Sequence, residues 1–296
     1  MTGGPRRRAR SFSRLTPYLF IAPAVILFSI FTIYPIIASF LLSFQTRQAG
    51  SYVFAGLANY ARLISDDYFL TALLNNFTIL AIQVPVQLVL ALLIAVGLNS
   101  ALVRFKGAFR VAYFMPAITA LVAYSVVFVI LLNTDFGLVN YFLHSILKLP
   151  KIDWLANPFW AKVGLMMAIT WRWTGYNMVI MLAGLQQISG ELYEAANIDG
   201  AGTVQRFFRI TVPMLKPIIL FAFILSTIGT LQLFDEPYIL TKGGPNNATL
   251  TAALYIYRQG FQYFDFGYAS AISYVLVAII AVLSWFQLKI GGADSD

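Results

Sequence analysis

Charged residues in this chain are separated by long apolar intervals, and this spacing constrains the fold more than any other feature. A helix of about 20 apolar residues crosses the hydrocarbon core of a membrane. Intervals without Asp, Glu, Lys or Arg cover 15–46, 68–103, 111–134, 173–190, 217–234 and 266–288. The runs are continuous rather than alternating, which indicates helices instead of barrel strands. The sequence therefore predicts an all-α integral membrane protein with six transmembrane helices, over roughly 15–43, 71–98, 111–133, 162–185, 215–237 and 267–289.

The composition agrees with this prediction. Of the 296 residues, 59% are hydrophobic and 11% are charged, whereas soluble domains carry roughly 25% charged residues. The chain has no cysteine, which excludes disulfides and thiolate metal sites, and its single histidine, His144, excludes a cluster of protein histidines around a metal. We therefore expect no metal and no cofactor bound by this chain itself.

The first apolar interval follows a basic stretch, as a signal peptide does. At about thirty uncharged residues it is too long for the apolar region of a signal peptide, and no soluble domain follows it. We therefore interpret it as the first transmembrane helix. The expected organisation is a basic tail over 1–14, one six-helix domain over 15–289 and a short tail over 290–296.

The distribution of Lys and Arg predicts the orientation in the membrane. With the N-terminus inside, the inner segments carry twelve basic residues and the outer segments six, which is the bias expected of cytoplasmic loops. Both tails, and the segment between the fourth and fifth spans, are then cytoplasmic. The net charge of +8 is explained by this topology signal and by contact with anionic lipid. Nucleic acid is not an expected partner.

The segment 189–214, between the fourth and fifth spans, is polar although apolar runs flank it. Ser189 can cap a short helix, and Glu191 and Glu194 then lie near its start, where the helix dipole favours negative charge. Gly200 can adopt the positive φ that ends this helix. A second short helix is predicted from the spacing of Val204, Phe207, Phe208 and Thr211. These patterns leave two interpretations open, namely a surface that approaches another protein and an amphipathic loop lying on the membrane.

The same segment resembles the EAA loop of ABC-importer permease subunits. The likeness rests on Glu194-Ala195-Ala196, Asp199-Gly200-Ala201, Phe207, Ile210 and Pro213, with Val212 where the family usually has Leu. In that family the loop forms a coupling helix that docks into a cleft of a cytoplasmic ATPase. The resemblance implies that Glu194 is the acidic contact and Gly200 the close-approach turn. The implied ATPase-coupling residues are Glu194, Ala195, Ala196, Asp199, Gly200, Ala201 and Phe207.

Three further stretches resemble the carbohydrate, maltose-type branch of these permeases. They are FAGLANYARL at 54–63, GLQQISGELYEAANIDGA at 184–201, and the long segment 234–261 that begins FDEPYILTKGGP. Ser189-Gly190 replaces the usual proline before the Glu-Leu-Tyr-Glu run. With the six spans, the likeness covers nearly the whole chain. It implies the type I importer permease fold in a bacterial inner membrane.

The resemblance also implies partners. These are a second homologous permease subunit, two cytoplasmic ABC ATPase subunits that use ATP and Mg, and an extracytoplasmic sugar-binding protein. The external segment 235–265 is expected to receive the binding protein, although it can equally be read as a plain connector.

Polar residues within the spans indicate where a solute passes. Such residues are costly in a membrane and face a cavity or another helix. Sugars need amide and hydroxyl partners and aromatic faces, which the fourth and fifth spans supply. In the maltose-type family these helices contribute to the sugar pocket. The candidate substrate-binding residues share one helical face in each span. They are Thr170, Trp173 and Asn177, at positions i, i+3 and i+7 of the fourth span, and Ser226, Gly229, Thr230 and Leu233 of the fifth.

Three other polar residues of the spans are not assigned to solute binding. For Gln83 and Gln87, which share a face of the second span, interhelical hydrogen bonds are favoured over contact with the solute. Arg172 is expected to reach the membrane margin by snorkelling and has no assigned role.

No catalytic motif is present. The chain has no G-x-x-x-x-G-K-[ST] phosphate loop, so it is predicted not to be an enzyme, and any ATP hydrolysis belongs to another chain. The favoured function is a pathway-forming subunit of a sugar ABC importer. The alternatives are an ABC permease for another solute and a stand-alone ion-coupled transporter. The ion-coupled alternative requires a buried acid relay, whereas Asp235 and Glu236 lie only at the outer end of the fifth span. The sequence does not identify the sugar.

Overall fold

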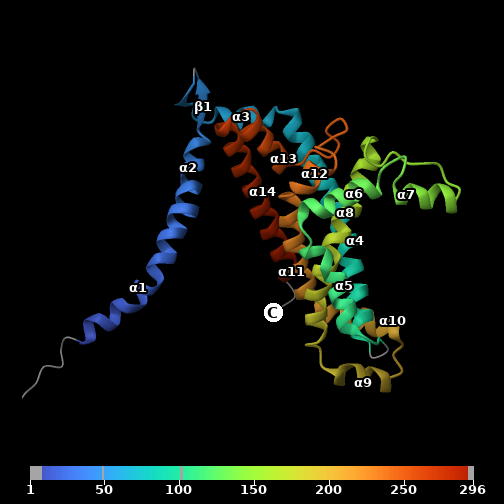
Figure 1. Cartoon of the computed structure of the whole chain (residues 1–296). Coiled ribbons are helices and arrows are strands. Elements are labelled where there is room, and N and C mark those ends of the chain that lie inside the picture. Colours follow the sequence, from blue (N-terminus) through green and yellow to red (C-terminus); the bar gives the residue numbers. More distant parts are fainter. Residues whose placement is uncertain (1–8, 49, 101–102, 293–296) are drawn as a thin grey trace, which may run out of the picture.

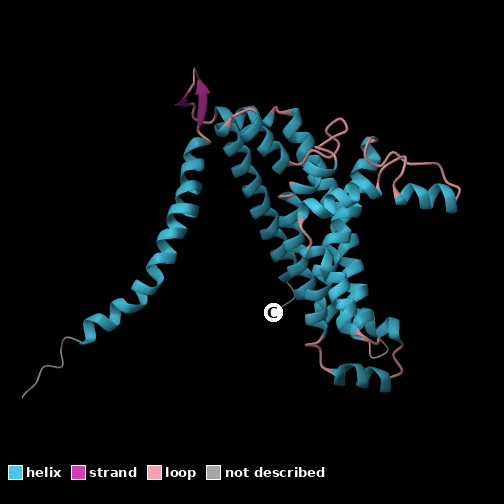
Figure 2. Ribbon diagram, in the orientation of Figure 1, coloured by secondary structure: helices cyan, strands magenta, loops and turns pink. Residues whose placement is uncertain are grey.

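The chain is helical almost throughout, as the sequence predicts (Figure 2). The structure is a computed structural model that describes residues 9–48, 50–100 and 103–292. Residues 1–8 and 293–296, which hold most of the two predicted tails, lie outside the described residues. One feature was not predicted: a two-stranded antiparallel sheet formed by β1 (Gln45–Gln48) and β2 (Ser51–Phe54).

Four helices of the described chain are long and apolar enough to cross a membrane. They cover Thr16–Leu42, Asp67–Asn99, Thr203–Leu231 and Phe266–Gly292, and a fifth span is added if one bent helix pair counts as a single crossing. The predicted fourth span is α8 (Pro158–Leu185), which runs through the centre of the bundle (Figure 1). Its polar residues make it less apolar than the other long helices.

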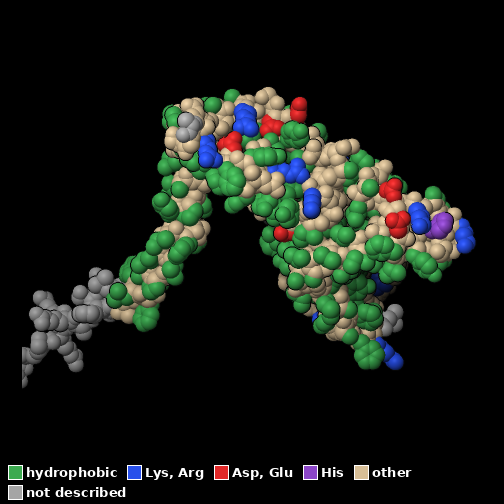
Figure 3. All heavy atoms as spheres, turned by 45° about the horizontal axis from the view of Figure 1, so that its top comes forward, with side chains coloured by type: hydrophobic (Ala, Val, Ile, Leu, Met, Phe, Trp, Pro, Cys, Tyr) green, Lys and Arg blue, Asp and Glu red, His purple; other side chains and the backbone are tan. Residues whose placement is uncertain are grey.

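The first helix projects away from the rest of the molecule. It consists of α1 (Ala9–Phe28), a π-helical turn (Ser29–Ile33) and α2 (Tyr34–Leu42), and Figure 1 shows it as an arm beside the bundle. None of the residues in its most apolar 18-residue stretch is buried, and Figure 3 shows hydrophobic side chains along its length. This arm therefore exposes a continuous apolar surface.

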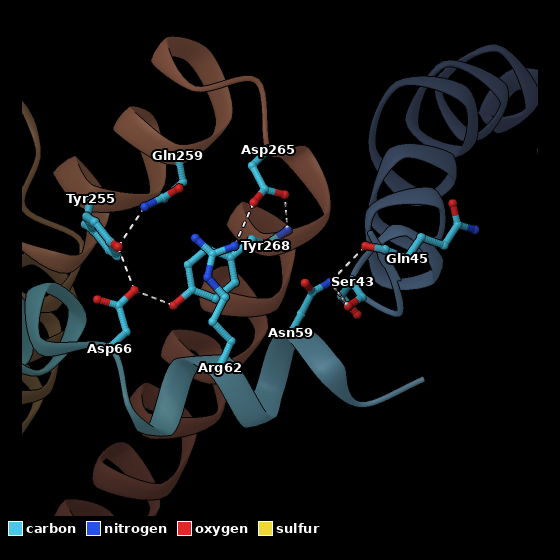
Figure 4. A network of polar contacts seen from close by, with 9 residues as sticks. All are labelled: Ser43, Gln45, Asn59, Arg62, Asp66, Tyr255, Gln259, Asp265 and Tyr268. Carbon is cyan, nitrogen blue, oxygen red and sulfur yellow. Dashed lines mark hydrogen bonds and ion pairs between the residues drawn. The ribbon is translucent and has the colours of Figure 1, made fainter. Parts of the chain in front are cut away.

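The arm contacts the bundle only near its C-terminal end, among the described residues. The hydroxyls of Ser39 and Tyr274 lie 3.1 Å apart, and the ring of Phe40 meets the ring of Tyr274 edge-on at 5.0 Å. Just beyond the arm, Asn59 of α3 (Ala58–Ile64) donates hydrogen bonds to the carbonyl oxygens of Ser43, at 2.9 Å, and Gln45, at 2.8 Å (Figure 4). These contacts fix the base of the arm.

The third predicted span, 111–133, is not one continuous helix. The chain forms α5 (Lys106–Ile118) and α6 (Leu121–Leu131), which meet at 96°. Pro116 removes one hydrogen-bond donor from the last turn of α5, and Thr119 and Ala120 adopt extended backbone angles. The proline was visible in the sequence, but apolar length alone does not report a bend.

The fifth predicted span also differs at both ends. The helix α10 (Thr203–Arg206), a π-helical turn (Phe207–Thr211) and α11 (Val212–Leu231) form one continuous helix. The predicted second short helix of the segment 189–214 is therefore the start of this span. At the other end, the chain leaves the helix after Leu231 and forms the separate short helix α12 (Asp235–Leu240).

The remaining elements complete a bundle around α4 (Asp67–Asn99) and α8. They are α7 (Leu138–Tyr141), α9 (Gly190–Ile198), α13 (Ala252–Tyr257), α14 (Phe266–Gly292) and π-helical turns at Phe142–Ile146 and Arg258–Gln262. Figure 1 places α9 at the end of the bundle opposite α3 and α13.

Close helix packing rests on small residues. A Cβ added to Gly175 of α8 would lie 1.7 Å from the carbonyl oxygen of Tyr113, so α5 packs directly on the backbone of α8. The core between α4, α8 and α11 includes Ala91, Ala95 and Met178, all fully buried. The scaffold that carries the polar residues of α8 is therefore tightly packed.

Candidate functional site

A cavity of about 230 Å³ lies between α8, α11 and α12. Six of the seven predicted substrate-binding residues line it together: Trp173, Asn177, Ser226, Gly229, Thr230 and Leu233. Leu233 lies just after the end of α11 rather than on the predicted helical face, yet it still reaches the cavity. We call this cavity the central pocket.

The polar groups of the central pocket are held by α8 and α11. The side chain of Asn157 caps the start of α8 by accepting hydrogen bonds from the N–H groups of Phe159 and Trp160. Further along α8, the Asn177 amide donates to the Ser226 hydroxyl of α11 at 3.3 Å. The pocket wall therefore offers an amide and a hydroxyl that already face each other.

Aromatic surface accompanies these polar groups. The rings of Trp173 and Tyr176 meet edge-on at 5.8 Å, and both residues line the central pocket. Amide, hydroxyl and aromatic groups together can bind the hydroxyls and the C–H faces of a polyhydroxylated solute.

The structure does not bring Thr170 to the central pocket. This residue lines a separate, mostly apolar groove of about 880 Å³ between α4, α5 and α8. Its carbonyl oxygen accepts a hydrogen bond from the Thr174 hydroxyl at 2.6 Å. The spacing of 170, 173 and 177 suggested one shared face, but the boundary between the two cavities runs along α8 between Thr170 and Trp173.

Gln83 and Gln87 do not form the interhelical hydrogen bond that was predicted for them. Instead, the side-chain amide of Gln83 donates a hydrogen bond to the side-chain carbonyl oxygen of Gln87, within α4. Both side chains are buried, and Gln87 lines the central pocket while Gln83 lines the apolar groove. Their spacing of four residues in one helix would have allowed this bond to be predicted.

Several residues of the central pocket were not selected from the sequence. They are Gln87, Tyr176, Asp235 and Glu236. Glu236 is 3% exposed, although the sequence placed it only at an outer helix end. The fifth span was predicted to continue to residue 237, so the sequence did not indicate a separate short helix that folds back over the pocket.

Arg172 is buried inside the protein, and its predicted position at a membrane margin stays a prediction. Its side chain is 5% exposed, and its guanidinium lies 4.5 Å from the ring centre of Tyr124 and 5.5 Å from that of Trp173. One terminal nitrogen, Nη2, donates to the carbonyl oxygen of Ala117 at 3.4 Å. That carbonyl belongs to the last turn of α5, where helix carbonyls lack intrahelical partners and a cation is favourable. Arg172 therefore lies against the break between α5 and α6.

The segment between α8 and α11 forms a second candidate site. Ser189 caps α9 as predicted, and its hydroxyl accepts a hydrogen bond from the Glu191 N–H at 3.3 Å. Gly200 has a φ of +75°, as predicted for the turn that ends α9. Of the predicted coupling residues, Glu194, Ala195, Asp199 and Gly200 are exposed, and Ala196, Ala201 and Phe207 are half-buried.

Two side-chain contacts hold α9 against the following helix. The hydroxyls of Tyr193 and Thr211 lie 3.0 Å apart, and Arg206 donates a hydrogen bond to Asn197. Five large apolar residues of this segment that are not among the predicted coupling residues are exposed: Leu192, Ile198, Val204, Phe208 and Met214. An exposed apolar surface of this kind fits either a protein partner or the membrane surface.

A polar network ties the elements at the opposite end of the bundle (Figure 4). The Asp66 carboxylate accepts hydrogen bonds from the hydroxyls of Tyr255, at 2.6 Å, and Tyr268, and Arg62 pairs with Asp265 at 2.9 Å. Partial burial opposes ionisation of Asp66, but the hydrogen bonds from both tyrosines and from the start of α4 outweigh it, so the pKa of Asp66 lies below its usual value. This network connects α3, α4, α13 and α14.

Metal-binding potential is low in the part of the chain that the structure describes. No group of three or more His, Cys, Asp and Glu residues is arranged to hold a metal ion there.

Comparisons with known proteins give concordant results. Residues 67–290 match the protein family described as "Binding-protein-dependent transport system inner membrane component". The lactose transport system permease protein LacF of Rhizobium radiobacter is 46% identical over 286 residues, covering 95% of this chain and 96% of the relative. The arabinooligosaccharides transport system permease protein AraP of Bacillus subtilis is 39% identical, covering 95% and 90%.

A solved structure shares the fold. It comes from a bacterial ABC transporter involved in the import of the acidic polysaccharide alginate, and it matches with a TM-score of 0.84 over 97% of this chain and 100% of that chain, at 23% identity. A second structure of a bacterial alginate transporter, in complex with a periplasmic protein bound to an alginate pentasaccharide, matches with a TM-score of 0.81.

Proposed function

Since the chain belongs to the family of binding-protein-dependent transport system inner membrane components, we propose that it forms part of the transmembrane pathway of a bacterial ABC importer for a disaccharide or oligosaccharide. The relatives with the highest identities reported above are named as sugar transport permeases. The observation that carries the proposal within this molecule is the central pocket, where the amide of Asn177, the hydroxyl of Ser226 and the ring of Trp173 converge.

We infer a topology of six crossings of the inner membrane. The bent pair α5–α6 supplies one, α8 supplies another, and the four long apolar helices supply the rest. The excess of basic residues on one side supports cytoplasmic tails, at 1–14 and 290–296, around a single permease domain at 15–289. The segment 189–214 then faces the cytoplasm.

That segment is the proposed docking site for one of the importer's two ATPase subunits, which would bind ATP and Mg themselves. Support comes from its exposed acidic residue Glu194, its open turn at Gly200 and its exposed apolar side chains. ATP binding by the partners would move this segment and change the side from which the central pocket is open. Such an alternating-access cycle makes uptake depend on hydrolysis in another chain.

Two further partners follow from the surfaces of the molecule. The projecting arm at residues 16–42 exposes apolar surface that a second, homologous permease subunit would cover. The external loops around α12 and α13 would receive an extracytoplasmic sugar-binding protein, as the complex with a periplasmic protein supports by analogy. Crosslinking from the arm to a copurified second permease tests the first of these contacts.

An energy-source experiment separates this proposal from a stand-alone ion-coupled transporter. In cells that take up a labelled neutral sugar through this chain, arsenate should deplete ATP and stop uptake, while a protonophore that leaves ATP intact should have little effect. The opposite pattern would identify an ion-coupled transporter. Loss of uptake for an amino acid, and for none of a panel of sugars, on deletion of the chain would identify a permease for another solute.

A further inference from the structure

A buried cation and a buried carboxylate lie at the central pocket. Arg172 of α8 lies over the ring of Tyr124 of α6, and α12, which carries Glu236, packs against both α6 and α8. Exposed fractions are 5% for Arg172, 2% for Tyr124 and 3% for Glu236. Of the two charged residues, Glu236 lines the pocket directly, while Arg172 lies immediately behind it next to Trp173.

The guanidinium of Arg172 is incompletely paired. Its Nε and Nη1 atoms have no hydrogen-bond partner among the described residues, and no described carboxylate lies within ion-pair distance of it. Arginine keeps its charge in proteins, and an isolated buried charge is costly. Glu236 is a buried carboxylate on α12, which packs against α6 and α8. Burial raises the pKa of Glu236, which lies beyond the end of the fifth span, whereas the charge of Arg172 favours its ionised form.

We propose that Arg172 offsets the charge of Glu236 in the wall of the central pocket, so that the pocket carries no net positive charge and selects uncharged saccharides over acidic ones. This inference rests on the proposed function, because it names the substrate class of the same pocket. Glu236 is the specificity-determining residue that a solute meets. Arg172 is a positioning residue that acts through Tyr124 and through the carbonyl at the end of α5.

The fold by itself does not decide the charge of the solute. The alginate transporter shares this fold and is named for an acidic polysaccharide, so discrimination has to come from side chains along the pathway. Among the described residues that line the central pocket, Asp235 and Glu236 are charged, and no lysine or arginine lines it. Arg172 behind the wall therefore offsets one of these two negative charges, and no positive charge is left over to bind an acidic solute.

The absence of native cysteines permits a direct measurement of this balance. Gly229 lines the pocket, and a Cβ at this position meets no atom within 4 Å, so Gly229→Cys places one thiol inside the pocket. The full chain, purified with its partner subunits, is treated at pH 8 with a cationic and an anionic methanethiosulfonate. The ratio of the two rates is compared with the ratio for a free thiol in solution. Any change in thiolate fraction affects both reagents equally and cancels in the ratio.

The two single variants are expected to shift the ratio of reaction rates in opposite directions. In the unaltered background the ratio should lie within about tenfold of the free-thiol value. Glu236→Gln should shift the ratio towards the anionic reagent by about tenfold or more, and Arg172→Met should shift it towards the cationic reagent by a similar factor, because one unit charge is removed from a partly desolvated wall. The double variant should return close to the starting ratio.

Matched variants guard against trivial results. Asp135→Asn changes the same charge far along the sequence, outside the lining of the pocket, and should leave the ratio unchanged. Ser226→Cys provides a second, nearly isosteric thiol if Gly229→Cys fails to assemble. If Arg172→Met fails to assemble, the nearly isosteric Glu236→Gln alone decides the matter.

Three outcomes would overturn the proposal. They are an unchanged ratio in Glu236→Gln, shifts of Arg172→Met and Glu236→Gln in the same direction, and a thiol that reacts with neither reagent at both positions. These readouts do not require transport. If the ratios shift as expected while the energy-source experiment fails, the proposed function is rejected and the charge balance of the pocket stands.

Discussion

The central pocket and the α9 segment are two polar regions of the same apolar chain, and they satisfy their polar groups in opposite ways. In the pocket, the amide of Asn177 is buried and is hydrogen-bonded within the chain to Ser226. In the α9 segment, Glu194 and Gly200 are exposed, and large apolar side chains such as Ile198 face outward. A polar region completed by its own chain is suited to a small solute, whereas one that is left open is suited to another protein.

This difference has a practical consequence for mutagenesis. Changes in the α9 segment should act on association with a partner and leave the bundle intact, because few contacts bind that segment to the rest. Changes in the pocket should act on the solute and leave association intact. The predictions for the two regions pair the α9 segment with ATPase association and the central pocket with uptake kinetics. Loss of ATPase association in a pocket variant would contradict the comparison.

The largest effect is expected for Glu194→Lys. Reversing the exposed charge should abolish both uptake and copurification of the ATPase subunits, while insertion into the membrane is retained. Pull-down of ATPase activity with the tagged chain measures the association. Glu191→Lys is the matched control, since Glu191 is also exposed on α9 but lies outside the coupling motif. Full ATPase recovery with Glu194→Lys would remove the docking role.

A smaller effect is expected for Gly200→Val. The φ of +75° at this position is strained for a β-branched residue, although a Cβ would meet no other atom. The turn should shift and ATPase binding should weaken by about tenfold, which corresponds to roughly 1–2 kcal/mol of strain. Gly202→Val is the control, because Gly202 has a φ of −68° that valine tolerates. Equal weakening in both variants would show that the loss comes from bulk rather than from backbone conformation.

Thr230→Leu should change the solute readout alone. It replaces a hydroxyl in the pocket wall with an apolar group, and the loss of one hydrogen bond to a sugar should raise the apparent KM about fivefold to tenfold. ATPase association should be unaffected. Thr78→Leu makes the same chemical change on the exposed side of α4 and should leave the kinetics unchanged. Unaltered uptake kinetics in Thr230→Leu would place that residue outside the pathway.

The smallest effect is expected at the polar network that lies far from both regions. Asp66→Asn weakens the hydrogen bonds from Tyr255 and Tyr268 and should lower the melting temperature in detergent by about 2–4 °C at pH 7. Because the pKa of Asp66 is lowered on folding, its contribution is present above the unfolded-state pKa and is lost as the pH falls through the folded-state pKa. The difference between variant and wild type should therefore shrink below about pH 4. A constant difference at all pH values would assign the effect to packing.

The sequence predicted the helical membrane fold because apolar length is a local property. It also predicted the Ser189 cap and the positive φ of Gly200, which depend on neighbouring residues only. Six pocket-lining residues were selected because their spacing follows the helical repeat.

The failures at the α5–α6 bend and at Glu236 involve contacts between distant segments. At the bend, Arg172 donates a hydrogen bond to the carbonyl oxygen of Ala117, 55 residues away. The burial of Glu236 depends on α12 folding back over the pocket, which local patterns do not report. Arg172 itself was expected at a membrane margin because an isolated arginine has no better option there.

The unbroken helix from Thr203 to Leu231 joins these two regions mechanically. Its 29 residues span about 43 Å at 1.5 Å per residue, from the turn beside Gly200 to the hydroxyl-bearing side chains around the solute. A tilt of about five degrees around the end beside Gly200 would move the far end by about 3–4 Å, a distance comparable to one hydrogen bond. Under the proposed function, a displacement of this helix by the ATPase would therefore change the shape of the central pocket directly, with no intervening loop.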